Sequence, residues 1–347
     1  MKPALSQIVR FRNTVDRGLR DWMGSRDILE VHPPTLVPNP GLEPHLDGIA
    51  ALRRHSDWGQ LYLHTSPEYA IKAGLAAFGG DVFAMARCYR DEPPSRWHHP
   101  EFTMLEWYRH GTWDQLMTDC ESLLGHVCAL LERAYGPPLR SDLRVDSGWE
   151  RRGWHDLLHQ VTGVDRGMSE PEQRERLRQC GLDVDPGWSL DDLLSLAYVE
   201  RMEPAVCRNG RPAFVERFPA DQAALAQLCS DDPGVAERFE WYLPLPEGVD
   251  ARGNLEVGNA FGELLDATEQ RRRFAQDATA RAARGADVYP APLAMLSGLE
   301  QLTGPVSGIA VGVERVLCWL ALRQLGWRTG VADWIPGAPQ TWRSEEP

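Results

Sequence analysis

The segment from Arg87 to Arg109, RCYRDEPPSRWHHPEFTMLEWYR, constrains the fold more than any other part of the chain. The apolar run at 82–86 just before it is short enough to be a buried strand. Pro93 and Pro94 remove the backbone donors that a strand needs, so a polar loop follows. A second apolar and aromatic stretch begins at Glu101. The segment therefore predicts two strands joined by a loop.

Side chains of the second strand alternate between the two faces of a sheet, so Phe102, Glu106 and Tyr108 share one face. The loop before this strand carries charged and imidazole side chains, namely Arg90, Glu92, Arg96, His98 and His99. A solvated hairpin is the more common interpretation of such a pattern. An aromatic ring, a carboxylate and a phenol beside arginines can also stack a base, hold a cation and bind phosphate.

The same segment resembles motif 2 of the class II aminoacyl-tRNA synthetases. The resemblance rests on residues 90–92, on the loop, and on Pro100-Glu101-Phe102 leading into a strand. The residues HHPEFTMLEWY look like the version in lysyl-tRNA synthetases and in their shorter paralogues, the ligases that attach (R)-β-lysine to elongation factor P. The resemblance implies an α+β fold in which an antiparallel β-sheet is flanked by helices.

Composition sets broad limits on the class of protein. A chain of 347 residues, 43% of them apolar, can form one large domain or two modest ones. The net charge of −13 argues against a broad basic surface for nucleic acid. Seven cysteines without a CxxC pair favour the reducing cytoplasm over a disulfide framework or a zinc site. No apolar run is long enough to predict a membrane span or a signal peptide.

Apolar residues recur at helical spacing over 5–24, which predicts an amphipathic helix. A short strand at 28–31 follows, and Pro33 and Pro34 end it. Helix, strand and proline in this order resemble motif 1, which forms the dimer interface in this class. We therefore expect a homodimer.

Residues 38–60 read as a loop, and a strand at 61–63 leads to Ser66-Pro67-Glu68 and a helix through Ala77. An acid such as Glu68 is favoured in the first turn by the helix dipole alone. In the lysyl family the matching glutamate lies by the amino group of the substrate, and the resemblance assigns Glu68 the same role.

A predicted hairpin carries two further acids, Glu240 on a strand at 237–242 and Glu256 on its partner at 255–259. Facing each other across the hairpin, like charges would be destabilising unless a cation lay between them. Oxygen ligands of this kind suit Mg²⁺ held together with substrate phosphates. Two exposed glutamates on a strand surface are the alternative interpretation.

Glu256, Asn259 and Glu263 are not spaced by two residues, so a bulge near Gly258 is needed to aim all three inward. The following sequence, GELLDATEQRRRF, resembles the lysyl family, in which the acid matching Glu263 faces the distal ammonium of the substrate. Glu106 would meet the same cation. Two acids around one ammonium demand a lysine-like side chain, because a neutral one would leave them unpaired.

The segment SGIAVGVER, from Ser307 to Arg315, predicts a glycine-containing strand that turns into an apolar helix. An arginine in the first helical turn lies at the unfavourable end of the dipole and needs a partner, for which phosphate is one candidate. The pattern resembles motif 3, whose arginine contacts the tail of ATP. Gly312 would permit close approach of the backbone to the nucleotide.

The rest of the chain adds little to the function. Helices are predicted near 116–130, 191–201 and 220–229, and a strand near 214–218. We interpret 1–330 as one catalytic domain, with 137–190 as an irregular peripheral insertion that contains a short helix near 170–179. Residues 331–347 are a C-terminal tail.

The resemblance covers about residues 5–325 and implies ATP-dependent activation of a lysine-like amino acid as an adenylate. Arg90 and Mg²⁺ on Glu240 and Glu256 would stabilise charge on the α-phosphate, and Arg315 would hold the far phosphates. Phe102 would stack on adenine, and Glu92 would read its amino group. The implied nucleotide site comprises Arg90, Asp91, Glu92, His99, Phe102, Glu256, Val257, Gly312 and Arg315. The implied amino acid site comprises Ser66, Pro67, Glu68, Glu106, Tyr108, Asn259, Glu263 and Ala310.

The acceptor is inferred from what precedes motif 1. Lysyl-tRNA synthetases carry an anticodon-binding domain there, and this chain begins too close to motif 1 to contain one. Ala310, where the synthetases usually have glycine, also fits the elongation factor P ligases. We therefore expect elongation factor P as the acceptor and no tRNA.

Several departures from the family pattern keep two alternatives open. They are Asp91, His99, Ala260, Glu314 and a longer hairpin tip at 244–254. One alternative is a stand-alone ligase that loads a basic amino acid onto another carrier or a small molecule. The other is a catalytically silent paralogue that acts as a binding or regulatory subunit.

Overall fold

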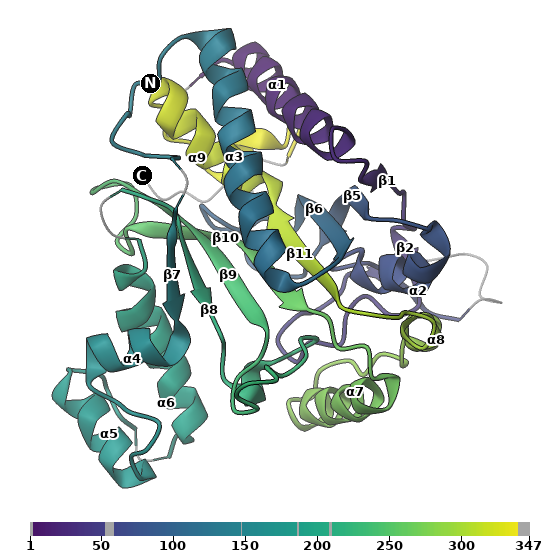
Figure 1. Cartoon of the computed structure of the whole chain (residues 1–347), viewed down its shortest axis with the longest axis vertical. Helices are drawn as coiled ribbons and strands as arrows, with labels where there is room; N and C mark the ends of the chain where they lie inside the picture. Colours follow the sequence, from purple (N-terminus) through teal and green to yellow (C-terminus); the bar gives the residue numbers. More distant parts are fainter. Residues whose placement is uncertain (1–2, 53–58, 147, 186, 208–209, 339–347) are drawn as a thin grey trace.

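The computed structural model describes residues 3–52, 59–146, 148–185, 187–207 and 210–338. Its centre is an eight-stranded sheet in the order β1-β5-β6-β11-β10-β9-β8-β7 (Figure 1). The strands are β1 (Leu29–Glu30), β5 (Val82–Tyr89), β6 (Glu101–His110), β11 (Val306–Gly312), β10 (Asn254–Gly262), β9 (Arg238–Pro244), β8 (Ala213–Glu216) and β7 (Glu150–Gly153). With its helices, this sheet confirms the predicted α+β fold.

The sheet is antiparallel in its six central strands and parallel at both edges, where β1 pairs with β5 and β7 with β8. Parallel neighbours need long crossover connections. Both edges have them, because a small three-stranded sheet and α2 (Glu68–Phe78) lie between β1 and β5, and three helices lie between β7 and β8. The prediction of an antiparallel sheet is therefore correct for the centre and wrong for the edges.

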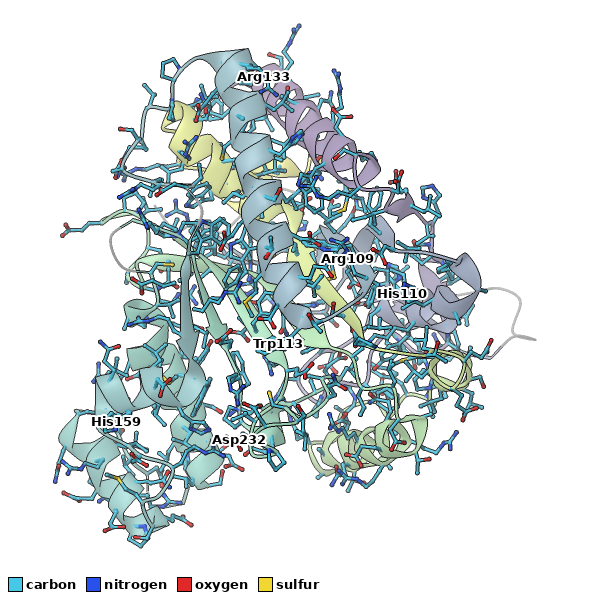
Figure 2. All side chains as sticks on the ribbon, viewed as in Figure 1. Arg109, His110, Trp113, Arg133, His159 and Asp232 are labelled. Atoms are coloured by element: carbon cyan, nitrogen blue, oxygen red, sulfur yellow. The ribbon has the colours of Figure 1, made fainter. Side chains whose placement is uncertain are left out.

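Three long helices cover one face of the sheet, α1 (Leu5–Gly24), α3 (Trp113–Tyr135) and α9 (Val313–Leu325) (Figure 1). Their buried apolar residues form one core with the sheet side chains that point toward them, such as Leu105, Trp107 and Trp241. At the end of β6, Arg109 fastens the strand to α3 by donating to Asp119 at 2.8 Å (Figure 2). The opposite face is left for other elements and for the site.

A second group of elements borders this opposite face. It consists of α2, α7 (Ala267–Ala283), α8 (Leu293–Leu299) and the small sheet of β2 (Leu36–Val37), β4 (Leu61–Leu63) and β3 (Ala50–Ala51). The fully buried Arg281 of α7 holds the predicted loop at 38–60, because its guanidinium donates to the carbonyl oxygens of Glu43 and Leu46 and to Asp47. Residues 53–58 of that loop lie outside the described part of the chain.

The region between β7 and β8 forms a separate helical unit (Figure 1). It contains α4 (Trp154–Thr162), α5 (Glu170–Gln179) and α6 (Leu190–Ala197), followed by a π-helical turn (Tyr198–Met202) and a 3-10 turn (Glu203–Ala205). These elements share a core of their own. The helix predicted near 170–179 is correct, but α4 and β7 were missed, since short elements in a charged stretch bury their apolar side only against distant partners.

The helix predicted at 220–229 is wrong. Only Ala220–Gln222 forms a 3-10 turn, and Ala224 has a positive φ of 49°, which an α-helix cannot accommodate. Ala226 and Leu228 instead form isolated bridges to Glu263 and Ala236. Tertiary pairing has overridden the helix preference of the alanines.

Part of the predicted tail is integral to the fold. The 3-10 turn Val331–Trp334 packs on α1 and α9, with Trp334 fully buried and its carbonyl oxygen accepting from Arg12 at 2.7 Å. Residues 339–347 of the tail lie outside the described residues. Within the described ranges, no helix combines the length and the apolar character that crossing a bilayer requires.

Candidate active site

A row of paired residues across four strands forms the floor of the site. Glu106 of β6 pairs with Ala310 of β11, Ala310 with Asn259 of β10, and Asn259 with Glu240 of β9. Directly paired residues of antiparallel strands point to the same side of a sheet. Because neighbouring strands lie about 4.8 Å apart, Glu106 and Glu240 stand at the two ends of a row about 14–15 Å long. The site therefore has one acid at each end.

The predicted bulge near Gly258 is present, as the pairing register shifts between Glu256 and Gly258. The predicted pairing of Glu240 with Glu256 is wrong, because Glu240 lies opposite Asn259 instead. The bulge also turns the side chain of Val257 into the hydrophobic core, where it is 2% exposed. Only the backbone of Val257 can therefore contact a nucleotide.

At one end of the row, two of the three predicted substrate acids bind a cation that sequence analysis did not identify. The Nζ atom of Lys72 lies 2.5 Å from a carboxylate oxygen of Glu68 and 2.5 Å from one of Glu263. Burial alone would lower the pKa of Lys72. The charges of Glu263 and Glu68 act in the opposite direction and outweigh it, so the pKa lies above its ordinary value. Lys72 is charged and fixes both acids in place.

Two sequence signals could have identified Lys72. It follows Glu68 by four residues, the spacing at which side chains meet on a helix. The chain also has only two lysines, at positions 2 and 72, among its 37 lysines and arginines. A lone internal lysine in an arginine-rich chain is a reason to examine its surroundings.

Glu106 differs from the other two acids, because no cation forms a salt bridge with it among the described residues. Its carboxylate accepts hydrogen bonds from the Ser66 hydroxyl at 2.5 Å and the Tyr108 hydroxyl at 3.1 Å. Burial, and then the nearby charge of Glu68, raise the pKa of Glu106 to about 8. Burial also raises the pKa of Glu263, to about 7, although Lys72 opposes that shift. A cation that binds beside Glu106 would favour the ionised carboxylate and lower these pKa values.

Gly308 makes this crowding possible. It pairs with Tyr108 across β11 and β6, and a Cβ atom there would lie 2.6 Å from Glu263 Oε1 and would overlap the Tyr108 ring. A side chain at this position would push the phenol and the carboxylate apart. The glycine of the predicted strand is therefore needed for close packing within the site.

Arg315 occupies the first turn of α9 and has its partners inside the chain. Its Nη1 donates to the carbonyl oxygen of Glu256 at 2.9 Å and to the carboxylate of Glu256 at 3.2 Å. Its Nε donates to the carbonyl oxygen of Trp97 at 3.2 Å. The guanidinium is thus held between β10 and the loop that joins β5 to β6.

His98 of that loop contacts the same arginine, with its Nε2 2.9 Å from Nη2 of Arg315. Burial and then the charges of Arg315, Arg252 and Arg90 lower the pKa of His98 to about 4. The imidazole is therefore neutral near pH 7, and its Nε2 accepts from Arg315. The remaining proton is on Nδ1, which lies 2.8 Å from the Ser95 hydroxyl oxygen.

His99, which the resemblance placed in the nucleotide site, is 4% exposed, and its Nδ1 lies 2.7 Å from the carbonyl oxygen of Glu101. The adjacent His98 is the histidine that touches Arg315. Sequence reasoning named His98 only as a member of the loop. Side chains alternate regularly in a strand but not in an irregular loop. The sequence therefore could not show which of the two neighbouring histidines turns toward the site.

Arg90 lies at the start of the same loop. The centre of its guanidinium is 5.2 Å from the centre of the Phe102 ring. Its Nε is buried without a hydrogen-bond partner, and within the described ranges the guanidinium forms no salt bridge. A buried guanidinium N–H without an acceptor is costly, and an anion is the acceptor that a guanidinium binds best. Arg90 is therefore suited to a phosphate.

The remaining predicted residues lie around these groups. The backbone N–H of Asp91 donates to the carbonyl oxygen of Asp47, and that of Glu92 to the carbonyl oxygen of Arg90. Pro67 and Gly312 are the residues that precede the first turns of α2 and α9.

At the other end of the row, Glu240 is fully hydrogen-bonded. One of its oxygens accepts from Tyr198 and from Tyr242, each at 2.7 Å, and the other accepts from Arg238 at 2.7 Å. Tyr198 comes from the π-helical turn after α6, which sequence analysis connected with no function. The helical unit thus contributes directly to the site.

A third acid, Glu203, was also missed. Burial raises its pKa to about 7, and the charges of Glu240 and Glu256 act in the same direction, against the charge of Arg252. Burial is likewise the largest cause of the raised pKa of Glu256. No group of three or more metal-ligating side chains is close enough to hold an ion alone within the described ranges. Each of these acids already has an arginine partner, Arg238 for Glu240, Arg252 for Glu203 and Arg315 for Glu256. Mg²⁺ takes one or two carboxylates plus phosphate oxygens, so these carboxylates fit it only together with bound phosphates.

Comparison with known proteins identifies the class to which this fold and site belong. Residues 1–324 match the family model of the class II tRNA synthetases (D, K and N). The chain therefore belongs to the class II aminoacyl-tRNA synthetase family, and it is an ATP-dependent ligase of that family.

Within this class, the chain is similar to proteins named elongation factor P–(R)-β-lysine ligase. It is 33% identical to the one from Pseudoalteromonas translucida over 88% of this chain and 89% of the relative. It is 35% identical to the one from Salmonella arizonae over 86% of each chain. It is 36% identical to the one from Pectobacterium atrosepticum over 90% of each chain.

The structure predicts a pH-dependent stability defect in Lys72→Met. Removing the cation leaves Glu68 and Glu263 as buried, unpaired acids, which should cost about 3–5 kcal/mol at pH 8. The cost should be smaller near pH 5.5, because Glu263, whose pKa burial raises to about 7, takes up a proton as the pH falls. Urea unfolding at both pH values measures the effect.

Arg272→Met is the matched control, since it removes a cation whose side chain is 57% exposed on α7. It should change stability by no more than about 0.5 kcal/mol at either pH. Equal losses for Lys72→Met at the two pH values would show that Lys72 does not neutralise these acids.

Proposed function

We propose that this protein activates (R)-β-lysine or lysine with ATP and transfers it to a lysine side chain of elongation factor P. The observation that carries the proposal is the grouping of charge in the site. Glu68, Glu106 and Glu263 form one acidic group, while Arg90 and Arg315 lie close enough to His98, in the loop that joins β5 to β6, to lower its pKa. The names of the relatives support the same substrate and acceptor.

The amino acid would extend from Glu106 toward the middle of the row. Its distal ammonium would bind Glu106 and Glu263 beside Tyr108, and its second amino group would lie near Glu68, Ser66 and Pro67. The Oδ1 atom of Asn259 is buried without a hydrogen-bond partner and is a further acceptor for an ammonium. Ala310 lies between Glu106 and Asn259 as the small residue under the substrate chain.

In the first step, the carboxylate of the amino acid attacks the α-phosphorus of ATP. A new P–O bond forms, the bond to the bridging oxygen of the β-phosphate breaks, and pyrophosphate leaves. Arg90 stabilises the charge that develops on the α-phosphate oxygens, and Arg315 holds the departing phosphates. In the second step, the acceptor amine attacks the carbonyl carbon, loses a proton and displaces AMP.

Phe102 would stack on adenine, while Glu92 would bind its amino group. Asp91, Gly312 and the backbone of Val257 would complete the nucleotide pocket, with His98 in the place that the resemblance gave to His99. Glu240 and Glu256 would hold Mg²⁺, which when bound neutralises phosphate charge. No side chain serves as a nucleophile, so catalysis depends on positioning and on fixed charge.

We further propose a cytoplasmic homodimer that does not act on tRNA. Support for the dimer comes from three leucines on the motif 1 segment and next to it, Leu5, Leu29 and Leu36, which are 59%, 54% and 42% exposed. Strand β1 is also the edge of the large sheet, where unpaired backbone groups favour association.

The acceptor is tested by incubating the protein with ATP, one lysine isomer and purified elongation factor P, followed by peptide mass spectrometry. Acylation of a single lysine with (R)-β-lysine is the expected result. Activation without transfer would favour another carrier or a small molecule. No ATP–pyrophosphate exchange with any basic amino acid would favour the silent paralogue.

Arg90→Ala should lower the rate of adenylation about 10²–10³-fold, as loss of one preorganised donor to a developing oxyanion does elsewhere. ATP–pyrophosphate exchange with the preferred amino acid measures the rate. Arg133→Ala, at the exposed end of α3 (Figure 2), should retain the wild-type rate. A wild-type rate in Arg90→Ala would remove Arg90 from the mechanism.

The pH dependence of the reaction should report the pKa of about 8 for Glu106. An ammonium binds the ionised carboxylate, so kcat/KM for the amino acid should rise up to about tenfold per pH unit below the pKa and level off above it. Glu106→Gln should have a low kcat/KM throughout, and any remaining rise should level off near the pKa of about 7 of Glu263. A flat wild-type profile between about pH 6 and 8 would contradict the assigned role.

Leu29→Asp should convert the dimer to monomers, because it places a charge at the proposed interface. Sedimentation equilibrium measures the mass of the wild type and the variant. Leu293→Asp, on the exposed surface of α8, is the control that should remain dimeric. A monomeric wild type at micromolar concentration would be inconsistent with the proposed dimer.

A further inference from the structure

The tip of the β9–β10 hairpin, residues 245–253, is anchored to the main hydrophobic core. Leu245 and Val249 are each 6% exposed and belong to the main hydrophobic core. The tip also closes on itself, because the N–H of Leu245 donates to the carbonyl oxygen of Gly253 at 2.8 Å. Because the tip is anchored, the side chains that it carries have fixed positions.

The tip is joined to the loop that carries His98. The guanidinium of Arg96 donates to the carbonyl oxygen of Val249 at 2.5 Å. The indole N–H of Trp97 donates to the carboxylate of Asp250 at 2.6 Å, with the indole itself buried. The loop is therefore held at two consecutive residues, immediately before His98.

These contacts extend to the motif 3 arginine. Arg315 donates to the carbonyl oxygen of Trp97 and contacts His98, so the position of its guanidinium depends on the loop. Asp250 thus acts on Arg315 through one residue, Trp97. This makes Asp250 a positioning residue for the phosphate end of the site.

Asp250 also holds a third arginine at this place. Its other carboxylate oxygen accepts from the backbone N–H of Arg252 at 2.9 Å and lies 3.4 Å from Nε of the same residue. The other partner of the guanidinium is Glu203, at 3.5 Å. These separations are longer than that of a tight pair in the same protein, such as Arg281 with Asp47 at 2.6 Å. The side chain of Arg252 is 41% exposed and only loosely paired.

Hydrogen bonds connect Arg252 through Asp250 and Trp97 to Arg315, which places it at the phosphate end of the site, and two further observations support a role for it there. Its charge, like those of Arg315 and Arg90, lowers the pKa of His98. Its acidic partner Glu203 has a pKa of about 7 and is therefore only partly ionised at neutral pH. A polyphosphate brings more negative charge than this acid and can attract the guanidinium away from it.

We propose that the hairpin tip is part of the nucleotide site, where Asp250 fixes the His98 loop and Arg252 is a third cation for the β- and γ-phosphates of ATP and for pyrophosphate. This proposal rests on the proposed function. It adds a binding residue from a segment that is longer than in the family pattern.

Arg252→Gln tests the proposal in ATP–pyrophosphate exchange with the preferred amino acid. We expect the KM values for ATP and for pyrophosphate to rise about tenfold. This is the lower end of the effect of removing a charge-assisted hydrogen bond, because the side chain is partly exposed. The KM for the amino acid should remain unchanged. Arg252→Lys, which keeps the charge, should restore part of the loss.

The control is Arg328→Gln, which removes another arginine contact to the same tip, a hydrogen bond to the carbonyl oxygen of Gly248. It should leave both KM values at the wild-type level. Unchanged KM values in Arg252→Gln would overturn the proposed phosphate contact. An equal rise in the KM values for ATP and the amino acid would overturn it too, because it would indicate a purely structural role.

The positioning role of Asp250 is tested by a double-mutant cycle with Trp97. Asp250→Asn and Trp97→Phe each weaken or remove the same hydrogen bond, so each should raise the KM for ATP and the double variant should add little. Fully additive effects on the KM for ATP would show that the hydrogen bond between Trp97 and Asp250 does not position the loop that contacts Arg315.

Calorimetric titration with MgATP separates this proposal from the proposed function. If the wild type binds MgATP but no amino acid supports ATP–pyrophosphate exchange, the proposed function fails. Weaker binding of MgATP by Arg252→Gln would still support the nucleotide contact in that case. If the wild type exchanges normally and both proteins bind MgATP equally, the contact fails and the proposed function stands.

Discussion

Burial of like charges on one face of a sheet is the constraint on which the rest of the site depends. Glu106, Glu240 and Glu263 are 1%, 8% and 2% exposed above strands whose opposite face is packed with apolar residues, so little water is present to screen them. Glu256 lies beside them with a side chain that is 39% exposed. Each acid therefore needs a cation, a hydrogen-bond donor or a proton. Lys72, Arg238 and Arg315 supply part of this charge from within the chain. The remainder is what a diamino acid and a metal ion would neutralise.

The three motif segments are joined by a second buried acid network, away from the open face. Glu314, one of the departures from the family pattern, is 1% exposed and accepts hydrogen bonds from Arg12 of α1 and from both the backbone and the hydroxyl of Thr103 in β6. Since Glu314 immediately precedes Arg315, this network fixes the start of α9. Glu314 therefore stabilises the junction of the three motif segments, and Arg315 is the residue of this pair that faces the loop carrying His98.

Elements with a strong local pattern could be predicted, and those that depend on distant partners could not. The helix at 5–24, the two strands around the His98 loop and the bulge near Gly258 were predicted correctly, because apolar periodicity and the spacing of inward residues are local properties. The predicted helix at 220–229 was wrong, because its alanines pair with residues far along the chain. Strand β7 was missed for the same reason, since its partner β8 lies more than fifty residues away.

By itself, the sequence determined the order of the three motifs, the face of β6 that carries Glu106, and the need for a cation beside the acids, because each follows from residue type and spacing along one strand. Only the tertiary structure decided which cation that is, which histidine contacts Arg315, and that Tyr198 and Glu203 lie beside Glu240. Those outcomes depend on strand register and on packing between segments distant in the chain. Neither property is encoded in any short stretch of residues.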